Sequence, residues 1–297
     1  MIRYPTVKQL RYFVALTETR HFGEAAKACF VSQSAFSAAI QELESLLEVQ
    51  LVDRTNRKVT ITALGEEVAT QARLCLSDIE SLVEMAGHRH EPLTGPLRLG
   101  VIPTIAPFLL PTLLPKLRRA YPKLKPYLYE DQTERIHEEL LEGKLDVLLL
   151  ALPYDLKSVE TMPLFKDHFC LAHRDKTELV NPEAYRVNRL NADSVLLLED
   201  GHCLRDHALE ACRIRDTAKV SRFAASSLLT LIEMVDADLG ITFLPEMARD
   251  SALLKNTRVK MQPVGARSYR TIGLAWRKGS ARVAEFELLG EFLRDNR

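Results

Sequence analysis

Two cysteines, Cys203 and Cys212, are the residues whose type and spacing point most directly to chemistry. Cys203 follows the turn-like pair Asp200-Gly201 and a histidine, and an arginine and an aspartate stand two and three residues after it in the chain. Residues 208–211 favour helix, and a helical rise of about 1.5 Å per residue would hold the two Cα atoms about 13 Å apart. A disulfide needs them within roughly 7 Å. Oxidation that joined these thiols would therefore change the shape of the segment; otherwise they are two unrelated buried thiols.

The composition is that of a soluble globular protein, and we expect no bound cofactor. The 297 residues suggest two domains, and 46% hydrophobic with 27% charged residues is ordinary for such proteins. The N-terminus lacks the apolar core of a signal peptide, and the longest apolar run, residues 147–152, is too short to span a membrane. Five cysteines do not make a disulfide framework, which predicts a cytoplasmic protein with reduced thiols. No metal-ligand spacing or glycine-rich phosphate loop is present.

The first ninety residues have the pattern of a winged helix-turn-helix. Apolar residues recur at helical spacing over residues 6–18, an alanine-rich helical segment covers 24–28, and Ser32 is placed to cap a third helix over 33–47. Residues 51–62 read as a β-hairpin around a polar turn. One long amphipathic helix follows over 63–86. A hairpin directly after a helix-turn-helix forms a wing.

These segments resemble the DNA-binding domain of the LysR-type transcription regulators. The resemblance rests on Ala25-Ala26, Val31-Ser32-Gln33-Ser34, Leu51-Val52-Asp53-Arg54 and Thr62-Ala63-Leu64-Gly65. It implies a DNA-binding domain over 1–62, a dimerising linker helix and hinge over 63–94, and a regulatory domain over 95–297. The residues expected to meet double-stranded DNA are Ser32, Gln33, Ser34 and Ser37 on the recognition helix and Arg54, Arg57 and Lys58 on the wing. Alternatively, Ser32 is only a helix cap and the basic turn a solvated loop.

Charge departs from what that resemblance would suggest. The chain has no net charge, and the expected recognition helix, residues 33–47, contains no lysine or arginine. Non-specific DNA affinity comes from neutralising phosphates, so we expect it to be modest. The operator sequence does not follow from these residues.

The remaining two hundred residues alternate strands and helices, which predicts parallel α/β sheets. Strands are expected at 97–102, 126–129, 146–151, 169–172, 195–198, 239–245 and 269–276, and helices from about 103–120 and over 133–141. The order suits an α/β effector domain with two lobes, similar to periplasmic binding proteins, with ligand chemistry in the cleft between the lobes.

A narrower resemblance is to the peroxide-sensing members of that family. It is carried by Gly201-His202-Cys203-Leu204-Arg205-Asp206 with Cys212, by Ile102-Pro103-Thr104, by Gln132-Thr133 and by Arg270-Thr271-Ile272-Gly273-Leu274. It implies that Cys203 reacts with hydrogen peroxide, that Cys212 resolves the product into a disulfide, and that Thr104, His202, Asp206, Thr133 and Arg270 surround the peroxide. The implied partners are promoter DNA, RNA polymerase, a cellular thiol reductant and further copies of the chain, as a homodimer or homotetramer.

Two other functions compete with a peroxide sensor. The chain could be a LysR-type regulator that answers a small metabolite in the cleft, with incidental cysteines, or a thiol peroxidase built on the same fold. The winged helix-turn-helix argues against a dedicated enzyme. Individual residues also have structural alternatives: Thr104 could cap a helix and Arg270 could form a structural ion pair. Cys29, Cys75 and Cys170 have no motif around them, and we expect them to be structural.

Overall fold

The structure is a computed structural model that describes residues 4–54, 59–86, 92–183, 185–186 and 190–297. The chain divides near residue 90 into two compact units. The N-terminal unit contains the predicted helices, hairpin and long helix in the predicted order: α1 Val7–Thr19, α2 Phe22–Ala28, α3 Gln33–Leu47, β1 Val52–Arg54, β2 Val59–Ile61 and α4 Ala63–Ala86. Strands β1 and β2 are antiparallel, as a wing requires.

Local signals explain where the N-terminal helices begin. The Thr6 hydroxyl accepts from the Gln9 N–H in a capping box at α1, and Ser32 Oγ accepts from the Ala35 N–H at 3.3 Å at α3. Helix α2 starts at Phe22, two residues earlier than predicted, because the His21 side chain caps it through Nδ1. The hydrophobic faces of α1 and α3 then meet in one core, with Phe13 and Phe36 completely buried.

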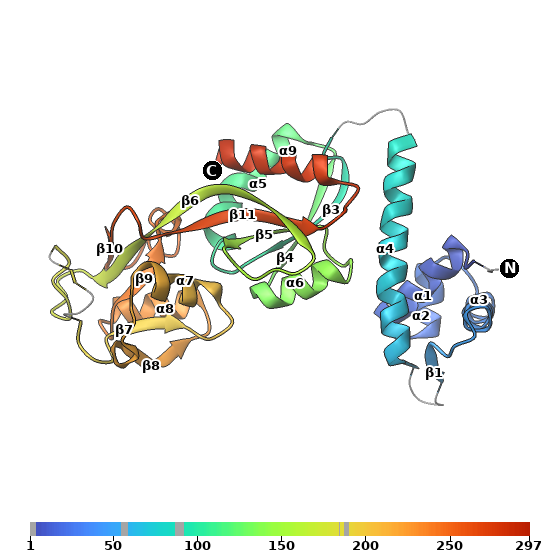
Figure 1. The fold of residues 1–297 in the computed structure, drawn as a ribbon, viewed down its shortest axis with the longest axis horizontal. Helices are drawn as coiled ribbons and strands as arrows, with labels where there is room; N and C mark the ends of the chain where they lie inside the picture. Colours follow the sequence, from blue (N-terminus) through green and yellow to red (C-terminus); the bar gives the residue numbers. More distant parts are fainter. Residues whose placement is uncertain (1–3, 55–58, 87–91, 184, 187–189) are drawn as a thin grey trace. The chain divides into compact units, whose positions relative to one another are not determined.

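The C-terminal unit has two lobes that share strands β6 and β11 (Figure 1). The first lobe contains β3 Gly95–Val101, α5 Ala106–Ala120, β4 Leu124–Glu130, α6 Thr133–Leu141, β5 Val147–Leu152 and α9 Val283–Asn296. The second contains β7 Val195–Leu198, α7 Cys203–Ala211, η2 Thr217–Lys219, β8 Val220–Ala225, α8 Leu228–Asp236, β9 Thr242–Pro245, η3 Glu246–Ala248 and β10 Val259–Pro263. Each lobe has its own hydrophobic core.

The predicted parallel pairing is present in both lobes, but other strands pair antiparallel. Strands β3, β4 and β5 are parallel, and so are β7 and β8, as the alternating pattern indicated. Strand β6, Val159–Arg174, is much longer than predicted and runs antiparallel to β11, Tyr269–Arg277. Beyond that pairing β6 continues antiparallel to β9 and β10. Two long return strands therefore connect the lobes, and residues on them can contact both.

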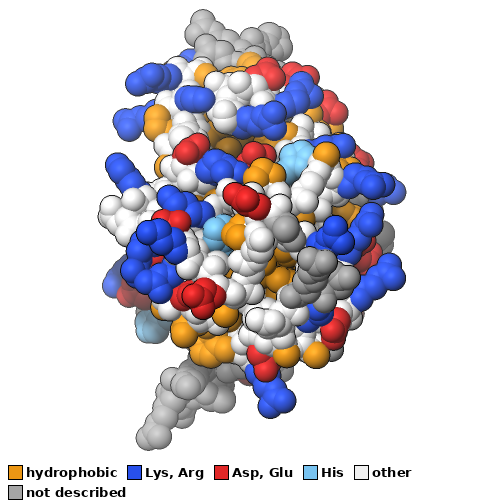
Figure 2. Space-filling model, turned by 90° about the vertical axis from the view of Figure 1, so that its left-hand side faces the viewer, with side chains coloured by type: hydrophobic (Ala, Val, Ile, Leu, Met, Phe, Trp, Pro, Cys, Tyr) orange, Lys and Arg blue, Asp and Glu red, His pale blue; other side chains and the backbone are white. Residues whose placement is uncertain are grey.

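Basic and acidic side chains are interspersed over the end of the second lobe, with no large surface of one sign (Figure 2). This agrees with the equal numbers of basic and acidic residues in the sequence. Among the described residues, no helix is long and apolar enough to cross a membrane.

Candidate functional site

The turn that precedes α7 places Cys203 at the first position of that helix. His202 has extended backbone and is the N-cap residue. Gly201 has φ +94°, and a Cβ on it would stand 2.6 Å from Gln132 Oε1. Only glycine fits this close approach without displacing a neighbour. The turn thereby brings the start of α7 against the loop between β4 and α6.

Cys203 and Cys212 are free thiols at opposite ends of α7, as the sequence predicted. Cys203 is 4% exposed and packs in the core of the first lobe, whereas Cys212 is 3% exposed and packs in the core of the second. The helix between them holds their Cα atoms about 13 Å apart. Burial raises the pKa of Cys212 to about 12, so this thiol is protonated at neutral pH.

Arg270 is a fully buried cation held by three oxygens beside this site. It is the cross-strand partner of Asp167, and its Nε donates to Asp167 Oδ2 at 3.0 Å. Nη1 donates to Thr104 Oγ1 at 2.9 Å and Nη2 to the Thr104 carbonyl at 2.8 Å. Asp167 Oδ1 accepts from the Met247 N–H at 3.3 Å, which completes the carboxylate's hydrogen bonds. Since Thr104 Oγ1 accepts from the guanidinium, its own O–H remains available as a donor.

Burial is the strongest influence on the pKa of the Cys203 thiol, and neighbouring groups modify it. Burial raises the pKa of Cys203 above its ordinary value, while the Arg270 charge and then the Thr133 hydroxyl oppose the rise. Thr133 is 1% exposed, and its Oγ1 makes no hydrogen bond of normal geometry with any described residue, the thiol included. The hydroxyl therefore lies close enough to the thiol to lower its pKa, and it has no other polar partner among the described residues.

His202 and Asp206 differ in exposure to solvent: His202 is buried and Asp206 is exposed. His202 is buried, and burial lowers its pKa, so its imidazole is neutral at pH 7. The Glu199 charge and a hydrogen bond with the Ser226 backbone oppose this lowering of the His202 pKa. Asp206 is exposed in the first turn of α7, and its negative charge raises the pKa of Cys203.

Arg205, two residues after Cys203 in the chain, is engaged by other partners. Arg205 pairs with Asp200, with Nε 2.9 Å from Oδ1, and donates from Nη1 to the Leu198 carbonyl. Arg270 is the cation that acts on Cys203.

His207, which no motif in the sequence singled out, lies one helical turn after Cys203. His207 is 8% exposed, and its Nε2 is 2.9 Å from the Pro153 carbonyl. A carbonyl only accepts, so Nε2 carries the proton and Nδ1 is a bare acceptor. That Nδ1 is buried and has no partner among the described residues. The spacing of four residues from Cys203 was the available signal, because residues i and i+4 share a helix face.

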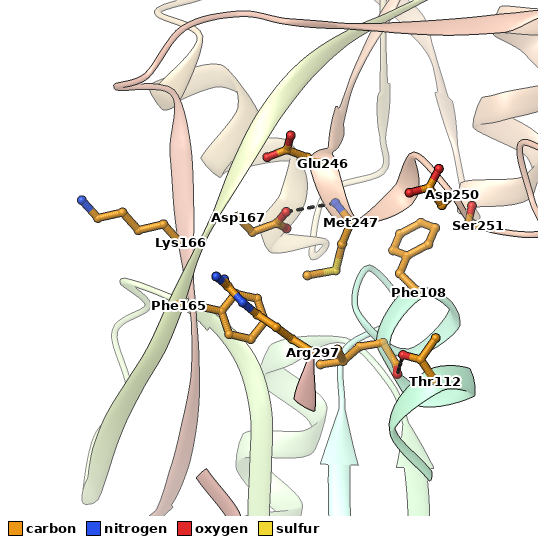
Figure 3. Close-up of a pocket in the computed structure, with 11 residues that line it drawn as sticks. Phe108, Thr112, Phe165, Lys166, Asp167, Glu246, Met247, Asp250, Ser251 and Arg297 are labelled. Carbon is orange, nitrogen blue, oxygen red and sulfur yellow. Dashed lines mark hydrogen bonds between the residues drawn. The ribbon is translucent and has the colours of Figure 1, made fainter. Parts of the chain in front are cut away.

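A cavity of about 380 Å³ lies next to the Arg270–Asp167 pair, between α5, β6 and the turn that contains η3 (Figure 3). Asp167 and Met247 line it, and the Met247 thioether is 3.9 Å from Arg270 Nη2. The Arg297 guanidinium stacks over the Phe165 ring at 4.9 Å on the same wall. A molecule in this cavity would therefore touch groups that hold Arg270.

The remaining cysteines are placed in different ways. Cys170 is buried on β6 and accepts from Arg249 Nη2 at 3.4 Å, while Cys29 is half-buried and Cys75 is exposed. A structural packing role therefore fits Cys170 better than Cys75. No cluster of candidate metal ligands occurs within the part of the chain that the structure describes.

The predicted DNA-contact residues gather at the start of α3. Ser32, Gln33 and Ser34 are exposed and Ser37 is half-buried, and the Ser32 and Ser34 hydroxyls are 3.2 Å apart. Arg54 ends strand β1, and the predicted contacts Arg57 and Lys58 lie outside the described residues.

One acidic residue of α3 has a structural role. Glu44 Oε1 accepts from the backbone N–H groups of Leu51 and Val52, at 2.9 and 3.0 Å, and so anchors the start of the wing. The Glu44 carboxylate is therefore engaged in hydrogen bonds within the N-terminal unit.

Comparison with known proteins defines the class to which this fold and site belong. Residues 7–66 match the family described as "Bacterial regulatory helix-turn-helix protein, lysR family", and residues 90–297 match the "LysR substrate binding domain". The chain belongs to the LysR family of bacterial transcription regulators.

Within this family the chain is similar to OxyR. It is 40% identical to the "DNA-binding transcriptional dual regulator OxyR" of Escherichia coli, over 97% of this chain and 94% of that protein. A full-length OxyR structure from Pseudomonas aeruginosa, with a cysteine-to-aspartate substitution, superposes with a TM-score of 0.83 at 34% identity and covers 98% of this chain and 95% of that one. The chain is also 41% identical to the "HTH-type transcriptional regulator EstR" of Acinetobacter baylyi, over 99% and 98% of the two lengths.

Proposed function

We propose that this protein is a DNA-binding transcription regulator that senses hydrogen peroxide by forming a reversible disulfide between Cys203 and Cys212. One observation carries the proposal: a buried thiol at a helix start lies beside the cation Arg270 and the unpartnered hydroxyl of Thr133. The Cys212 thiol is buried in the hydrophobic core of the second lobe. The names of relatives such as "Hydrogen peroxide-inducible genes activator" of Dickeya chrysanthemi, 39% identical over 98% of this chain and 95% of that protein, support it.

The first chemical step is attack of the Cys203 thiolate on one peroxide oxygen. The O–O bond breaks, Cys203 becomes a sulfenic acid, and the departing hydroxide takes a proton to leave as water. The hydroxyls of Thr104 and Thr133 have unused donor capacity and would hydrogen-bond the peroxide oxygens, with Arg270 stabilising the negative charge. His202 and Asp206 lie on the same turn and helix and would orient the bound molecule.

The second step is attack of the Cys212 sulfur on the sulfenic sulfur, which releases the second water and forms the disulfide. Disulfide geometry requires the Cα atoms within roughly 7 Å, so α7 must unwind and Cys212 must leave its core. The lost packing makes the disulfide strained, and strained disulfides are the ones that cellular thiols reduce readily.

The regulatory cycle implied by this chemistry includes further partners. Double-stranded operator DNA would bind the winged helix-turn-helix. The disulfide would change how the subunits of a homodimer or homotetramer are arranged, and RNA polymerase would respond to that change at the promoter. A cellular thiol reductant would reset the disulfide, and we infer that the protein acts in the cytoplasm, where such reductants keep thiols reduced. A sensor needs one reaction for each cycle, so we infer a regulator and not a thiol peroxidase.

The second candidate function is regulation by a small metabolite, and the cavity beside Asp167 and Met247 favours it. Thiol counting tests the two functions directly. One equivalent of peroxide should remove two of the five thiols in the wild-type protein, and dithiothreitol should restore them. Loss of no thiol under mild peroxide would favour the metabolite.

The reaction should accelerate steeply as pH rises. Because burial raises the pKa of Cys203 above its ordinary value of 9.0, the thiolate is a minor species at neutral pH. Its fraction, and with it the rate, should grow about tenfold for each pH unit between about pH 6 and 8. Stopped-flow measurement of the rate constant for peroxide checks this. A rate independent of pH in that range would mean that the reacting thiol is already ionised.

We also expect the linker helix α4 to pair with another copy. Ala69 and Ala72 are buried, but farther along the helix Leu82 and Val83 are 64% and 63% exposed. An apolar stripe left open in this way is usually covered by a symmetric partner. Light scattering should give a mass of two or four chains, and Leu82→Glu should lower it and weaken operator binding. A monomer that binds an operator tightly at micromolar concentration would contradict this.

A further inference from the structure

Phe30 lies in the turn between α2 and α3 and combines two features that do not stabilise the folded domain. Its side chain is 95% exposed, so the ring gains nothing from burial. Its backbone has φ +58°, in the left-handed region that a bulky residue adopts only with strain. Strained backbone that persists is a reason to look for a functional role.

The backbone conformation itself has a clear cause. The Phe30 N–H donates to the Lys27 carbonyl and the Val31 N–H to the Ala26 carbonyl, both at 3.0 Å, which ends helix α2. A left-handed residue at such a helix end is usually glycine or asparagine. Among the described non-glycine residues with positive φ, Phe30 is the one that is both apolar and exposed; Leu93 is buried. The turn explains the φ but not the aromatic ring.

The ring's position indicates what covers it. Phe30 stands two residues before Ser32, the N-cap of α3, and three and four residues before Gln33 and Ser34, whose side chains are exposed. In a helix-turn-helix the N-terminal residues of the recognition helix contact base edges in the major groove. Helix α3 has no lysine or arginine, so its contacts with DNA must be largely non-ionic.

We propose that Phe30 packs against the apolar surface of duplex DNA where α3 enters the groove, and that it contributes affinity there. Duplex DNA offers two such surfaces, the C5-methyl group of thymine and the carbons of deoxyribose. The proposal rests on DNA binding by this domain and is independent of the thiol chemistry. A contact of this kind would explain why the chain keeps an aromatic side chain at a strained, exposed position.

The test compares Phe30→Asn with Phe30→Leu in the full-length protein. Asparagine tolerates the left-handed backbone but removes the apolar surface, whereas leucine keeps an apolar side chain under the same strain. The probe is the tightest duplex that the wild-type protein selects from a random-sequence library. We expect F30N to raise Kd about tenfold, the size of a good base-edge contact. We expect F30L to stay within about threefold of wild type, and the melting temperature of F30N to be equal or higher.

Salt dependence and modified DNA make the result specific. A lost apolar contact leaves the slope of log Kd against log salt unchanged, because the number of neutralised phosphates, and so of released counterions, stays the same. If Phe30 contacts a thymine methyl group, replacing that thymine by deoxyuridine should weaken DNA binding by the wild-type protein but not by F30N. If Phe30 contacts deoxyribose, the replacement should weaken DNA binding by neither protein. Wild-type affinity in F30N, or equal losses in F30N and F30L, would overturn the proposal. So would unchanged DNA binding with lost transcription, which would assign the ring to a protein partner.

Discussion

Replacing Cys203 with serine is expected to abolish the response to peroxide while leaving DNA binding intact. A serine hydroxyl is nearly isosteric with the thiol but does not attack peroxide, so no sulfenic acid and no disulfide can form. Cys203 lies in the C-terminal unit and the helix-turn-helix in the N-terminal unit. Thiol titration after one equivalent of peroxide should therefore show no loss in C203S, and its operator Kd should equal that of the reduced wild-type protein.

Cys212→Ser is the matched variant, because it removes the second thiol and leaves the first. It should consume one thiol per peroxide and give a sulfenic acid that dimedone traps on Cys203, with further oxidation in excess peroxide. Its operator binding should not switch as in wild type, because α7 has no disulfide to unwind it. Equal peroxide responses in wild type, C203S and C212S would place the sensor elsewhere in the chain.

Arg270→Met should strongly destabilise the protein and slow its reaction with peroxide. The substitution leaves the Asp167 carboxylate, 4% exposed, without its charge partner. Breaking a buried pair from one side typically costs about 3–5 kcal/mol of unfolding free energy. Loss of the cation also removes the largest influence that opposes burial at Cys203, so the pKa of that thiol should rise further. Urea unfolding and stopped-flow oxidation measure the two effects.

The double variant D167N with R270M separates these effects. It leaves no unpaired buried charge, so it should recover much of the lost unfolding free energy. It should not recover the oxidation rate, because the cation beside Cys203 is still absent. Recovery of both would mean that Arg270 serves only the fold. Full stability in R270M alone would contradict the buried ion pair itself.

Local signals in the sequence predicted the elements that position the site. Ser32 and the apolar spacing after it predicted α3 over 33–47 without error. The helix-forming residues 208–211 predicted a helix between Cys203 and Cys212, and helix α7 lies there. These features depend on neighbours within a few residues, which is the range over which capping and periodicity act.

Contacts between distant segments were beyond the same reasoning. The pairing of Arg270 with Asp167 depends on the antiparallel register of β11 with β6, and no local pattern specifies a register between strands so far apart in sequence. The pattern predicted only residues 169–172 of β6, and helices α8 and α9 were not predicted. The use of Glu44 to anchor the wing also appears only once α3 and β1 are side by side.

Mapping the disulfide that limiting peroxide forms is the most direct test of whether Cys203 and Cys212 are the peroxide-sensing pair. The full-length reduced protein would be treated with one equivalent of hydrogen peroxide, its remaining thiols alkylated, and its peptides mapped by mass spectrometry under non-reducing conditions. We predict one dominant bridge, between the peptides that contain Cys203 and Cys212, with Cys29, Cys75 and Cys170 alkylated. If Cys203 and Cys212 are both alkylated after the peroxide is consumed, or if a bridge joins other cysteines, this pair is not the peroxide sensor.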